Sequence, residues 1–452
     1  MSTTKLFGTD GIRGHIHDEK LRPDYIMRLG QTVALLAHEE KKSRPSITIG
    51  RDTRASGAYL QQALVAGISS MGVDCYLAGI LPTAALALHS RQNDSCFGIM
   101  ISASHNPCQD NGLKIFDARG FKIDQSLELR IEEIFYRILC PKPAQIPGRI
   151  IEHDIVNNYH ALVNKILGDG TIFHGLKLVV DCAHGAAFQL APSLFQRLSC
   201  TTTFLGIEPD GFNINKNAGS EAPGHLIETV RKQGADLGIA FDGDADRVVF
   251  VDDTGEIIEG DAVLTLFAIH EQKLGRLHKN TVVSTIMSSV ALDNALAHYD
   301  IKVSRTDVGD KFVAQKMLEQ GFSFGGENSG HLLFFPECTT GDGIFSALKF
   351  LQLLKDSGQP ASTLKQCYTP SPRILTNIQV VRKIDLSELP KTNTAIVQVN
   401  QNLKGLGRVM FRYSGTENKA RILVEAGSMQ ECRRITNEIT QQFTDEMANN
   451  IL

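Results

Sequence analysis

Three aspartates at alternate positions form the densest cluster of chemically active side chains in the sequence. Asp242, Asp244 and Asp246 directly follow the apolar run ADLGIA and precede Arg247. On a short loop this spacing brings carboxylate oxygens together, and Mg²⁺ prefers such oxygen ligands while keeping positions open for a phosphate. A calcium loop of the EF-hand type is excluded, because its sixth position needs glycine and the flanks read as strands. A solvated acidic turn stays open as the alternative.

A second candidate site follows the apolar run CFGIMISA, which predicts a buried strand. The chain continues as Ser104-His105-Asn106-Pro107, so these side chains lie on a loop at a strand end, where open α/β sheets bind ligands. Ser104, beside His105, could act as a nucleophile, and Lys114 could accept a proton if its pKa is lowered. The alternative is a turn in which Asn106 and Pro107 form the bend and Ser104 only caps it.

A rival nucleophile lies in residues 321–325, which match the GxSxG motif of ester hydrolases and precede Glu327 and His331. That motif must lead straight into a helix, whereas residues 325–331 (GGENSGH) form a polar, glycine-rich loop. A glutamate and a histidine so close behind the serine would also not reach back to it. We therefore interpret this loop as a binding segment for sugar hydroxyl groups, which glutamate and serine side chains can engage.

Two further segments combine arginine, hydroxyl and glycine residues, a composition that favours phosphate binding. The first, residues 50–57 (GRDTRASG), follows a predicted strand and opens a predicted helix. Because Asp52 stands there between two arginines, a local salt bridge is favoured over direct ligand contact. For the second, residues 412–418 (RYSGTEN), we favour phosphate binding. The sequence has neither a P-loop motif nor GxGxxG, which removes the usual support for nucleoside triphosphate or dinucleotide binding.

Alternating periodicities predict the elements that carry these segments. In residues 24–40 apolar side chains recur at three- and four-residue spacing, which predicts a helix, and residues 46–50 read as a strand. The alternation continues to a proline-rich segment with the composition of a linker, CPKPAQIPG at residues 140–148. Two more runs of alternating strands and helices follow it. This pattern is typical of βαβ units.

The last part of the chain begins after a second linker, YTPSPRI at residues 368–374. The runs TNIQVVRK, TAIVQVN, GRVMFRY and ARILVEAG are predicted as strands, and a long helix starts at about Ser428. We therefore predict an α/β fold of three related α/β domains with mixed sheets, plus a smaller C-terminal α+β domain. The predicted domains are residues 1–148 with the serine loop (101–107), 149–253 with the aspartate loop (242–247), 254–367 with the sugar loop (325–331) and 374–452 with the phosphate loop (412–418).

Composition excludes several classes of protein. Of 452 residues, 42% are hydrophobic and 21% are charged, as in globular proteins that bury sizeable cores. The formal net charge is −4 and no block of like charges occurs, so no bulk attraction to nucleic acid is expected. Nine scattered cysteines without a CxxC pair argue against disulfides or a thiolate zinc site and favour a reducing cytoplasm. Neither a signal peptide nor an apolar run of about 20 residues is seen, so no membrane partner is expected.

With these motifs in view, the chain resembles the α-D-phosphohexomutase superfamily along its whole length. Five motifs agree in order: FGTDGIRG at residues 7–14, ISASHNP at 101–107, DGDADR at 242–247, GGENSGH at 325–331 and RYSGTEN at 412–418. The first and the last of them are most similar to the phosphoglucosamine mutase branch. Two residues depart from the pattern of that branch, because Asn328 stands where glutamine is usual and Asn418 where proline is usual.

The resemblance implies four domains around a central active-site cleft and a role for each motif residue. Ser104 would carry a phosphoryl group in the active enzyme, and the three aspartates together with that phosphoserine would bind one Mg²⁺. Lys114 would shuttle a proton. The remaining implied site residues are His105, Arg13 and Arg247 at the phosphoryl group, Glu327, Ser329 and His331 at the sugar, and Arg412, Ser414, Gly415 and Thr416 at the phosphate that does not react.

The implied activity is a two-step transfer. Phosphoserine gives its phosphoryl group to a sugar phosphate and then takes the other phosphate back from the resulting bisphosphate. In this branch the substrates are glucosamine 6-phosphate and glucosamine 1-phosphate, on the route to UDP-N-acetylglucosamine and cell-envelope precursors. The expected protein is a cytoplasmic monomer or homodimer whose partners are sugar phosphates and the bisphosphate.

Three alternatives stay open. A phosphomannomutase or phosphoglucomutase would use the same machinery, and Asn328 lies in the loop that would select the sugar. A Mg²⁺-dependent sugar phosphatase would transfer the phosphoryl group to water and release inorganic phosphate. A non-catalytic module would bind sugar phosphates without becoming phosphorylated, although the intact serine and aspartates argue against it.

Overall fold

The computed structural model of the chain describes residues 5–8, 10–40, 44–92, 95–137, 141–167, 173–414, 418–448 and 450. They form two compact units. The larger unit comprises Met1–Met287 and Ser304–Gln366, and the smaller comprises Ser288–Val303 and Cys367–Leu452. The serine, aspartate and sugar loops therefore belong to the larger unit, and the phosphate loop belongs to the smaller one.

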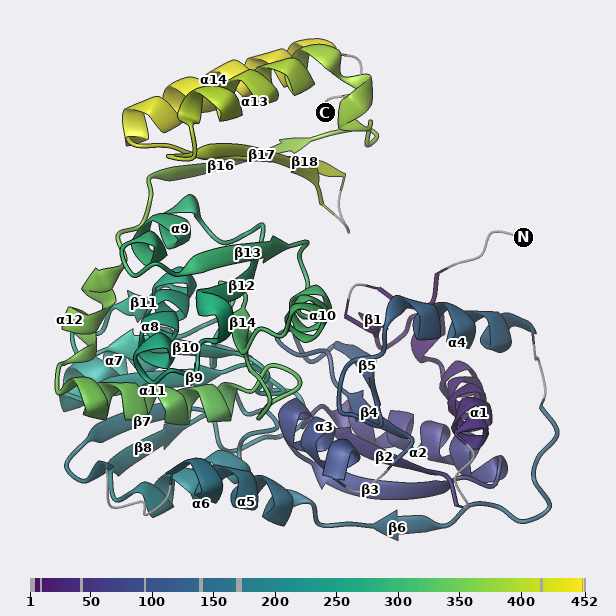
Figure 1. Cartoon of the computed structure of the whole chain (residues 1–452). Coiled ribbons are helices and arrows are strands. Elements are labelled where there is room, and N and C mark those ends of the chain that lie inside the picture. The colour runs from purple at the N-terminus through teal and green to yellow at the C-terminus, as the bar shows by residue number, and fades with distance from the viewer. Residues whose placement is uncertain are drawn as a thin grey trace. The chain divides into compact units, whose positions relative to one another are not determined.

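A six-stranded mixed sheet organises the first part of the larger unit (Figure 1). In order across the sheet, its strands are β1 (Ile12–His15), β5 (Asp110–Asp117), β4 (Phe97–Ile101), β2 (Ser46–Arg51), β3 (Asp74–Ile80) and β6 (Ile150–Glu152). Strands β4, β2, β3 and β6 run parallel, whereas β5 is antiparallel to both β4 and β1. The helices are α1 (Pro23–Glu39), α2 (Ala55–Ser70), α3 (Thr83–Gln92) and α4 (Gln125–Arg137). This is the α/β arrangement that the alternating periodicities predicted.

Helices α1 and α2 approach each other closely because each presents a glycine to the other's backbone. A Cβ atom on Gly30 would lie 2.5 Å from the carbonyl oxygen of Leu64, and one on Gly67 would lie 2.0 Å from that of Met27. Neither position has room for a side chain. Around these contacts the apolar faces of both helices join β2 and β4 in one buried core.

After the proline-rich segment the chain returns to the first sheet. Strand β6 pairs in parallel with β3, with Ile150 opposite Cys75. These residues follow the boundary predicted at residue 148, so the first sheet includes part of the segment that we assigned to the second domain. Three residues are too few for a hydrophobic pattern to reveal which strand they pair with.

A second mixed sheet carries the aspartate loop. Across the sheet its strands are β11 (Ile257–Ile258), β10 (Val248–Asp252), β9 (Leu237–Phe241), β7 (Lys177–Asp181) and β8 (Thr201–Leu205). Its helices are α5 (Val156–Leu167), α6 (Leu190–Phe195) and α7 (Gly224–Gln233). Strands β9 and β10 form an antiparallel hairpin, whereas β7 is parallel to both β8 and β9. The tip of that hairpin therefore stands at the carboxyl end of β7 and β9.

A four-stranded sheet follows, in the order β13 (Lys302–Thr306), β12 (Thr281–Thr285), β14 (Phe324–Gly326) and β15 (Leu332–Phe334). The helices of this part are α8 (Gly260–Lys273), α10 (Asp310–Gln320), α11 (Gly343–Ser357) and α12 (Ala361–Leu364). Short 3-10 turns occur along the whole chain, at Glu19–Leu21, Gln196–Leu198, His278–Asn280, Lys365–Cys367 and Leu386–Glu388.

Helix α11 also packs on the second sheet, because Phe350 stacks on Phe250 with ring centroids 4.2 Å apart. The second and third sheets thus share a packed core.

The smaller unit is a three-stranded antiparallel sheet with helices α13 (Pro390–Leu403) and α14 (Met429–Glu446) on one face (Figure 1). The strand order is β16 (Arg373–Gln379), β18 (Lys419–Glu425) and β17 (Arg408–Tyr413). Helix α9 (Val290–Ala297) belongs to this unit as well. Its first backbone N–H donates to the buried Glu425, which also pairs with Arg408 at 2.9 Å. The predicted α+β class of this part is confirmed.

One predicted strand of the smaller unit is wrong. The run TAIVQVN lies inside helix α13, which starts with Pro390. Pro390 is suited to a first helical turn, where its missing N–H leaves no bond unmade. Thr392, Ile396, Val399 and Leu403 are the buried residues of α13, and their spacing of three to four residues is that of a helix face. The β-branched residues of the run suggested a strand, but the longer apolar period decides the structure.

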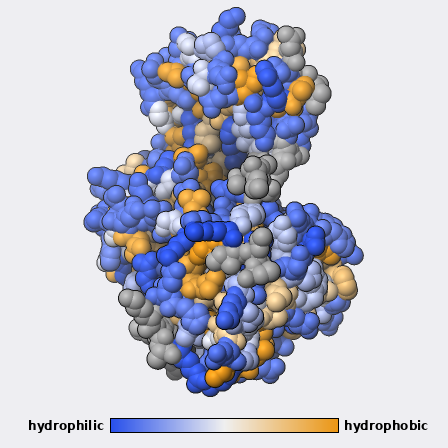
Figure 2. Space-filling view, turned by 90° about the vertical axis from the view of Figure 1, so that its right-hand side faces the viewer, coloured by the Kyte–Doolittle hydropathy of each residue, from blue (hydrophilic) through white to orange (hydrophobic). Residues whose placement is uncertain are grey.

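The face in Figure 2 is mainly hydrophilic and carries separate, small hydrophobic patches. Within the described part of the chain, no helix is long and apolar enough to cross a membrane. The eight cysteines that the structure describes are all free thiols.

We expect a buried histidine to make the stability of the larger unit fall in acid. His89 on α3 is fully buried, with its ring centroid 5.0 Å from that of His153. Burial, and then the neighbouring His153, lowers the pKa of His89 to about 4. Because this pKa lies below its unfolded value near 6.5, the stabilisation is complete above pH 6.5. It is lost as the pH falls to 4, and the loss amounts to about 3 kcal/mol.

The measurement is the thermal midpoint between pH 7 and pH 4 for the wild type and for His89→Gln. The variant should lose less stability on acidification than the wild type. His17→Gln, which changes an exposed histidine, is the matched control and should follow the wild type. Identical pH profiles for His89→Gln and the wild type would contradict the assignment.

Candidate active site

The aspartate loop is the tight connection between β9 and β10, whose ends Phe241 and Val248 face each other across the hairpin. Asp242, Asp244 and Asp246 each expose 2% or less of their surface, and one oxygen from each lies within 4.8 Å of the others. Ala245 between them adopts a left-handed φ of 56°. Burial rules out the solvated acidic turn, since three carboxylates this close and this dry need compensating positive charge.

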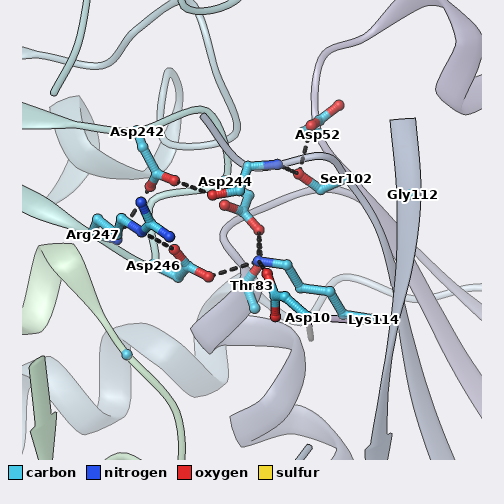
Figure 3. A network of polar contacts seen from close by, with 12 residues as sticks. Asp10, Asp52, Thr83, Ser102, Gly112, Lys114, Asp242, Asp244, Asp246 and Arg247 are labelled. Carbon is cyan, nitrogen blue, oxygen red and sulfur yellow. Dashed lines mark hydrogen bonds and ion pairs between the residues drawn. The ribbon is translucent and has the colours of Figure 1, made fainter. Parts of the chain in front are cut away.

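The serine loop, which leaves β4, meets the aspartate loop directly. The Oγ of Ser104 donates a hydrogen bond of 2.5 Å to Oδ2 of Asp242, and Ser104 is 1% exposed. Nδ1 of His105 lies 3.3 Å from the same Oγ. The backbone N–H of Ser104 donates to Oγ of Ser102, which in turn donates to Asp52 (Figure 3). Two segments that were singled out separately in the sequence therefore converge on one buried point.

Lys114 of β5 supplies positive charge to this point. Its Nζ lies 2.7 Å from Oδ2 of Asp244 and 2.7 Å from Oδ2 of Asp246 (Figure 3). Burial opposes the charge of Lys114, but attraction to Asp10, Asp244 and Asp246 outweighs it and holds its pKa well above the usual value. Lys114 could accept a proton only if its pKa were lowered. The surrounding carboxylates instead raise that pKa.

The charge that remains on the loop fits a divalent cation. Burial, with repulsion from Asp246 and Asp244, raises the pKa of Asp242 to about 8. Oδ2 of Asp244 accepts bonds from Lys114 and Thr83, whereas its buried Oδ1 has no hydrogen-bond partner among the described residues. The backbone N–H of Arg247 donates to Oδ1 of Asp242. Converging oxygen ligands, burial and an Asp244 oxygen that accepts no hydrogen bond from the described residues together match the requirements of Mg²⁺.

A second layer of alternating charges surrounds the aspartates. His331 lies 3.6 Å from Oδ1 of Asp246 and 3.1 Å from Oδ2 of Asp310, and Lys122 lies 2.6 Å from the same Oδ2. Burial lowers the pKa of His331, but attraction first to Asp310 and then to Asp246 outweighs it and raises the pKa to about 10. Lys122 also pairs with Asp10. His331 is thus brought to the site as a cation.

Arg13 and Arg247 stand beside the serine loop and the aspartates. Arg13 donates to the side chain of Asn106 at 3.3 Å and to that of Asp10 at 2.9 Å. Nε of Arg247 lies 3.9 Å from Asp246. Burial opposes the charge of Arg247, but Asp246 and Asp242 outweigh it and raise its pKa. Both guanidinium groups can therefore meet an anion carried on the serine.

The sugar loop joins β14 and β15 by a tight turn. Oε1 of Glu327 accepts a 3.1 Å hydrogen bond from the backbone N–H of Gly309. Glu327 is buried, whereas Ser329 is exposed. The side chain of Asn328 donates to the carbonyl of Met287 at 3.3 Å. The larger unit thus holds Glu327 and His331 near the charged cluster, and it leaves Ser329 open to solvent.

The serine of the GxSxG segment has a structural role. Oγ of Ser323 accepts the backbone N–H of His278 at 2.9 Å and donates to the carbonyl of Arg276 at 2.7 Å. The chain continues into strand β14 and not into a helix. Ser323 therefore fastens two backbone segments together, and the hydrolase interpretation is excluded.

The phosphate loop begins at the end of β17. Arg412 stands directly opposite Arg421 of β18, and Ser414, which is 5% exposed, accepts a 3.5 Å hydrogen bond from Arg421. Lys383 donates to the carbonyl oxygen of Ser414 at 2.6 Å. Two guanidinium groups facing each other across a ladder repel, which an anion between them would relieve. Gly415 and Thr416, also predicted here, lie outside the described residues.

Sequence motifs missed five charged residues of these two sites. Asp10 lies inside the FGTDGIRG motif, so a signal for it was available. The others are Lys122, Asp310, Lys383 and Arg421, which occupy ordinary helix, strand and loop positions without a local pattern. Their partners are distant in the sequence, and only the fold brings them together.

Comparison with known proteins gives one consistent result along the chain. Family models for phosphoglucomutase/phosphomannomutase match residues 4–139 as α/β/α domain I, 160–255 as domain II, 259–370 as domain III and 375–442 as the C-terminal domain. A phosphoglucosamine mutase of Anaeromyxobacter sp. (strain Fw109-5) is 40% identical over 447 residues, covering 97% of this chain and 95% of the relative. One of Desulforamulus reducens is 42% identical over 441 residues, covering 97% and 98%.

Solved structures show the same fold. A phosphoglucomutase/phosphomannomutase family protein of Burkholderia thailandensis matches with a TM-score of 0.82 at 24% identity, covering 99% of this chain and 98% of that one. Together with the full-length relatives, this confirms the resemblance and the predicted fold class. The chain belongs to the phosphoglucomutase/phosphomannomutase family and, within it, to the phosphoglucosamine mutases.

Proposed function

We propose that the chain interconverts glucosamine 6-phosphate and glucosamine 1-phosphate through a phosphorylated Ser104 and a sugar bisphosphate. The observation that carries this proposal is the 2.5 Å contact between the Ser104 hydroxyl and Asp242, inside a buried cluster of three carboxylates. Full-length relatives at about 40% identity that are named phosphoglucosamine mutase support the choice of substrate.

Asp242, Asp244 and Asp246, with the phosphate on Ser104, would hold the Mg²⁺ ion. When bound, it offsets negative charge on the phosphoryl oxygens. The fit rests on the burial of these carboxylates and on the buried Oδ1 of Asp244, which accepts no hydrogen bond from the residues that the structure describes.

In the first half-reaction the bond between phosphorus and Oγ of Ser104 breaks as a bond forms to the free hydroxyl of the sugar phosphate. The proton of that hydroxyl leaves with a base and is returned to Oγ of Ser104. We assign proton acceptance to His105, whose Nδ1 lies 3.3 Å from Oγ of Ser104. Lys114, whose raised pKa keeps it protonated, is assigned the return of a proton. Arg13 and Arg247 offset the charge that develops on the transferring group, so positioning and electrostatics supply most of the catalysis.

The second half-reaction returns the other phosphate of the bisphosphate to Ser104, so the sugar must bind in two orientations. We assign Glu327, Ser329 and His331 to the sugar hydroxyls. The phosphate that does not react is assigned to Arg412, Ser414, Gly415 and Thr416. Because that phosphate is the 1-phosphate in one orientation and the 6-phosphate in the other, its site must recognise phosphate alone, which paired guanidinium groups do well.

We also propose the domain boundaries, the cellular location and the oligomeric state of the protein. The four domains are proposed at residues 1–148, 149–253, 254–367 and 374–452, with β6 returning to the first sheet. The protein is proposed to be cytoplasmic, and a monomer or a homodimer. Phosphomannomutase or phosphoglucomutase activity is the alternative function, because the machinery is the same and Asn328 departs from the usual glutamine of the branch.

Replacing Ser104 by alanine should abolish the reaction, because no other hydroxyl carries the phosphoryl group. We expect a loss of three orders of magnitude or more in turnover, on the order of other nucleophile deletions. Conversion of the 1-phosphates of glucosamine, glucose and mannose is measured with Mg²⁺ and a trace of bisphosphate, and glucosamine should be preferred. Ser323→Ala is the matched control and should keep near-normal turnover. Near-normal turnover of Ser104→Ala would refute the phosphoserine assignment.

Mg²⁺ should stabilise the protein against heat, because it binds the folded cluster and not the unfolded chain. At 100 times the dissociation constant the gain is about 2.7 kcal/mol. Asp244→Asn, which removes one ligand charge, should weaken this gain strongly. Asp24→Asn, at an exposed carboxylate on α1, should leave it unchanged. The readout is the thermal midpoint against Mg²⁺ concentration, and an equal rise in Asp244→Asn and the wild type would exclude this site.

A further inference from the structure

The segment after β2, which the sequence left between a phosphate site and a local salt bridge, forms a buried salt bridge. Asp52 and Arg54 are both 0% exposed. Nε of Arg54 donates to Oδ2 of Asp52 at 2.9 Å, and the backbone N–H of Arg54 donates to Oδ1 at 3.0 Å. The favoured interpretation is thus confirmed, and it leaves open why two charges are buried so completely.

The guanidinium group of Arg54 is fully used by one loop. Nη1 donates to the carbonyl oxygens of Pro107 and Asp110 at 2.5 and 3.0 Å. Nη2 donates to those of Ser104 and Asn106 at 2.9 and 2.8 Å. With Nε on Asp52, all five N–H groups of an arginine have acceptors inside the protein. None is left for a phosphate.

This network binds both the backbone N–H and the backbone carbonyl of Ser104. Its N–H donates to Ser102 at 2.9 Å, and the hydroxyl of Ser102 is oriented because it donates to Asp52 at 2.7 Å (Figure 3). Its carbonyl accepts from Arg54 and also, at 2.8 Å, from the side chain of Asn215, which lies in the second α/β part of the chain. The backbone of Ser104 therefore has little freedom to turn.

This fastening holds Ser104 in a conformation that it would not adopt alone. Its φ is 52°, in the left-handed region, where the Cβ atom of a residue with a side chain comes too close to the backbone. Such a conformation persists only where the surroundings enforce it. It directs the side chain of Ser104 toward Asp242, at the distance of 2.5 Å.

We propose that Arg54, Asp52 and Ser102 are positioning residues that hold the hydroxyl of Ser104 against the aspartate loop. The inference rests on the proposed function, since it concerns the residue that carries the phosphoryl group. It assigns the GRDTRASG segment to the catalytic geometry and not to substrate binding. Lysine cannot replace Arg54, because one ammonium group has three donors and cannot reach four carbonyl oxygens in the plane of a guanidinium.

The test compares Arg54→Lys with Arg51→Lys. Arg51 is the neighbouring, half-buried arginine, which donates a 3.3 Å hydrogen bond to the carbonyl oxygen of Asp52. In Arg54→Lys we expect kcat to fall by about 100-fold, the size of a 1 Å misplacement, while KM for the sugar phosphate stays within about twofold. In Arg51→Lys both constants should stay within about threefold. Ser102→Ala keeps every charge and should also lower kcat with KM unchanged, which covers the case that Arg54→Lys does not fold.

Hydrogen exchange of peptides from residues 102–110 provides a readout that does not need turnover. Exchange should be faster than in the wild type in Arg54→Lys and Ser102→Ala, and unchanged in Arg51→Lys. A raised KM with normal kcat in Arg54→Lys would make Arg54 a substrate ligand and overturn the proposal, as would normal kcat and exchange in Ser102→Ala. A wild type without mutase turnover would instead refute the proposed function, and the exchange data would still decide the positioning role.

Discussion

The structure of the larger unit depends on burying three carboxylates in one short turn. One carboxylate oxygen each of Asp242, Asp244 and Asp246 lies within 4.8 Å of the others, and all three residues are almost completely shielded from water. Like charges at this distance in a poorly polarisable interior repel strongly unless cations stand beside them. The hairpin of β9 and β10 can therefore fold into this position only if other parts of the chain bring compensating groups to it.

The first α/β part supplies those groups from three of its elements. The loop after β4 brings the hydroxyl of Ser104 to Asp242, strand β5 brings Lys114 to Asp244 and Asp246, and the start of α3 brings Thr83 to Asp244. The third part of the chain adds His331, which is itself held by Asp310. The charged site is thus assembled from three parts of the larger unit. The three converging carboxylates, with Oδ1 of Asp244 accepting no hydrogen bond from the described residues, are what suit the cluster to a divalent cation.

Local patterns were sufficient to find the residues with a chemical signature. The alternate aspartates, the serine at a strand end and the arginine–hydroxyl–glycine loop were all visible in the sequence, and apolar periodicity placed most helices and strands. The wrong and missed predictions have a common cause, which is that the deciding information lies outside the local residue types. The run TAIVQVN has strand-like residue types but a helical apolar period, and β6 is too short to show its partner. Asp310 and Lys122 acquire meaning only through contacts with residues far along the chain.

Ionisation was the property least accessible from the sequence. Proton acceptance by Lys114 was expected to need a lowered pKa, yet three carboxylates around its ammonium group raise that pKa. The sign depends on the balance between burial and neighbouring charge, which no motif encodes. The short spacing of Asp52 and Arg54 indicated an ion pair, whereas the four carbonyl oxygens that bind Arg54 lie between the end of β4 and the start of β5, far along the chain, and no local pattern reveals them.

The central claim is that Ser104 carries a phosphoryl group that passes to a sugar phosphate. The most direct measurement is to label the enzyme at Ser104 with radioactive phosphate, remove free label, add glucosamine 1-phosphate with Mg²⁺ and follow the label in a single turnover. We expect the label to leave Ser104 and to appear in glucosamine bisphosphate and then in glucosamine 6-phosphate. Release of the label as inorganic phosphate, or its retention on the protein, would contradict the account.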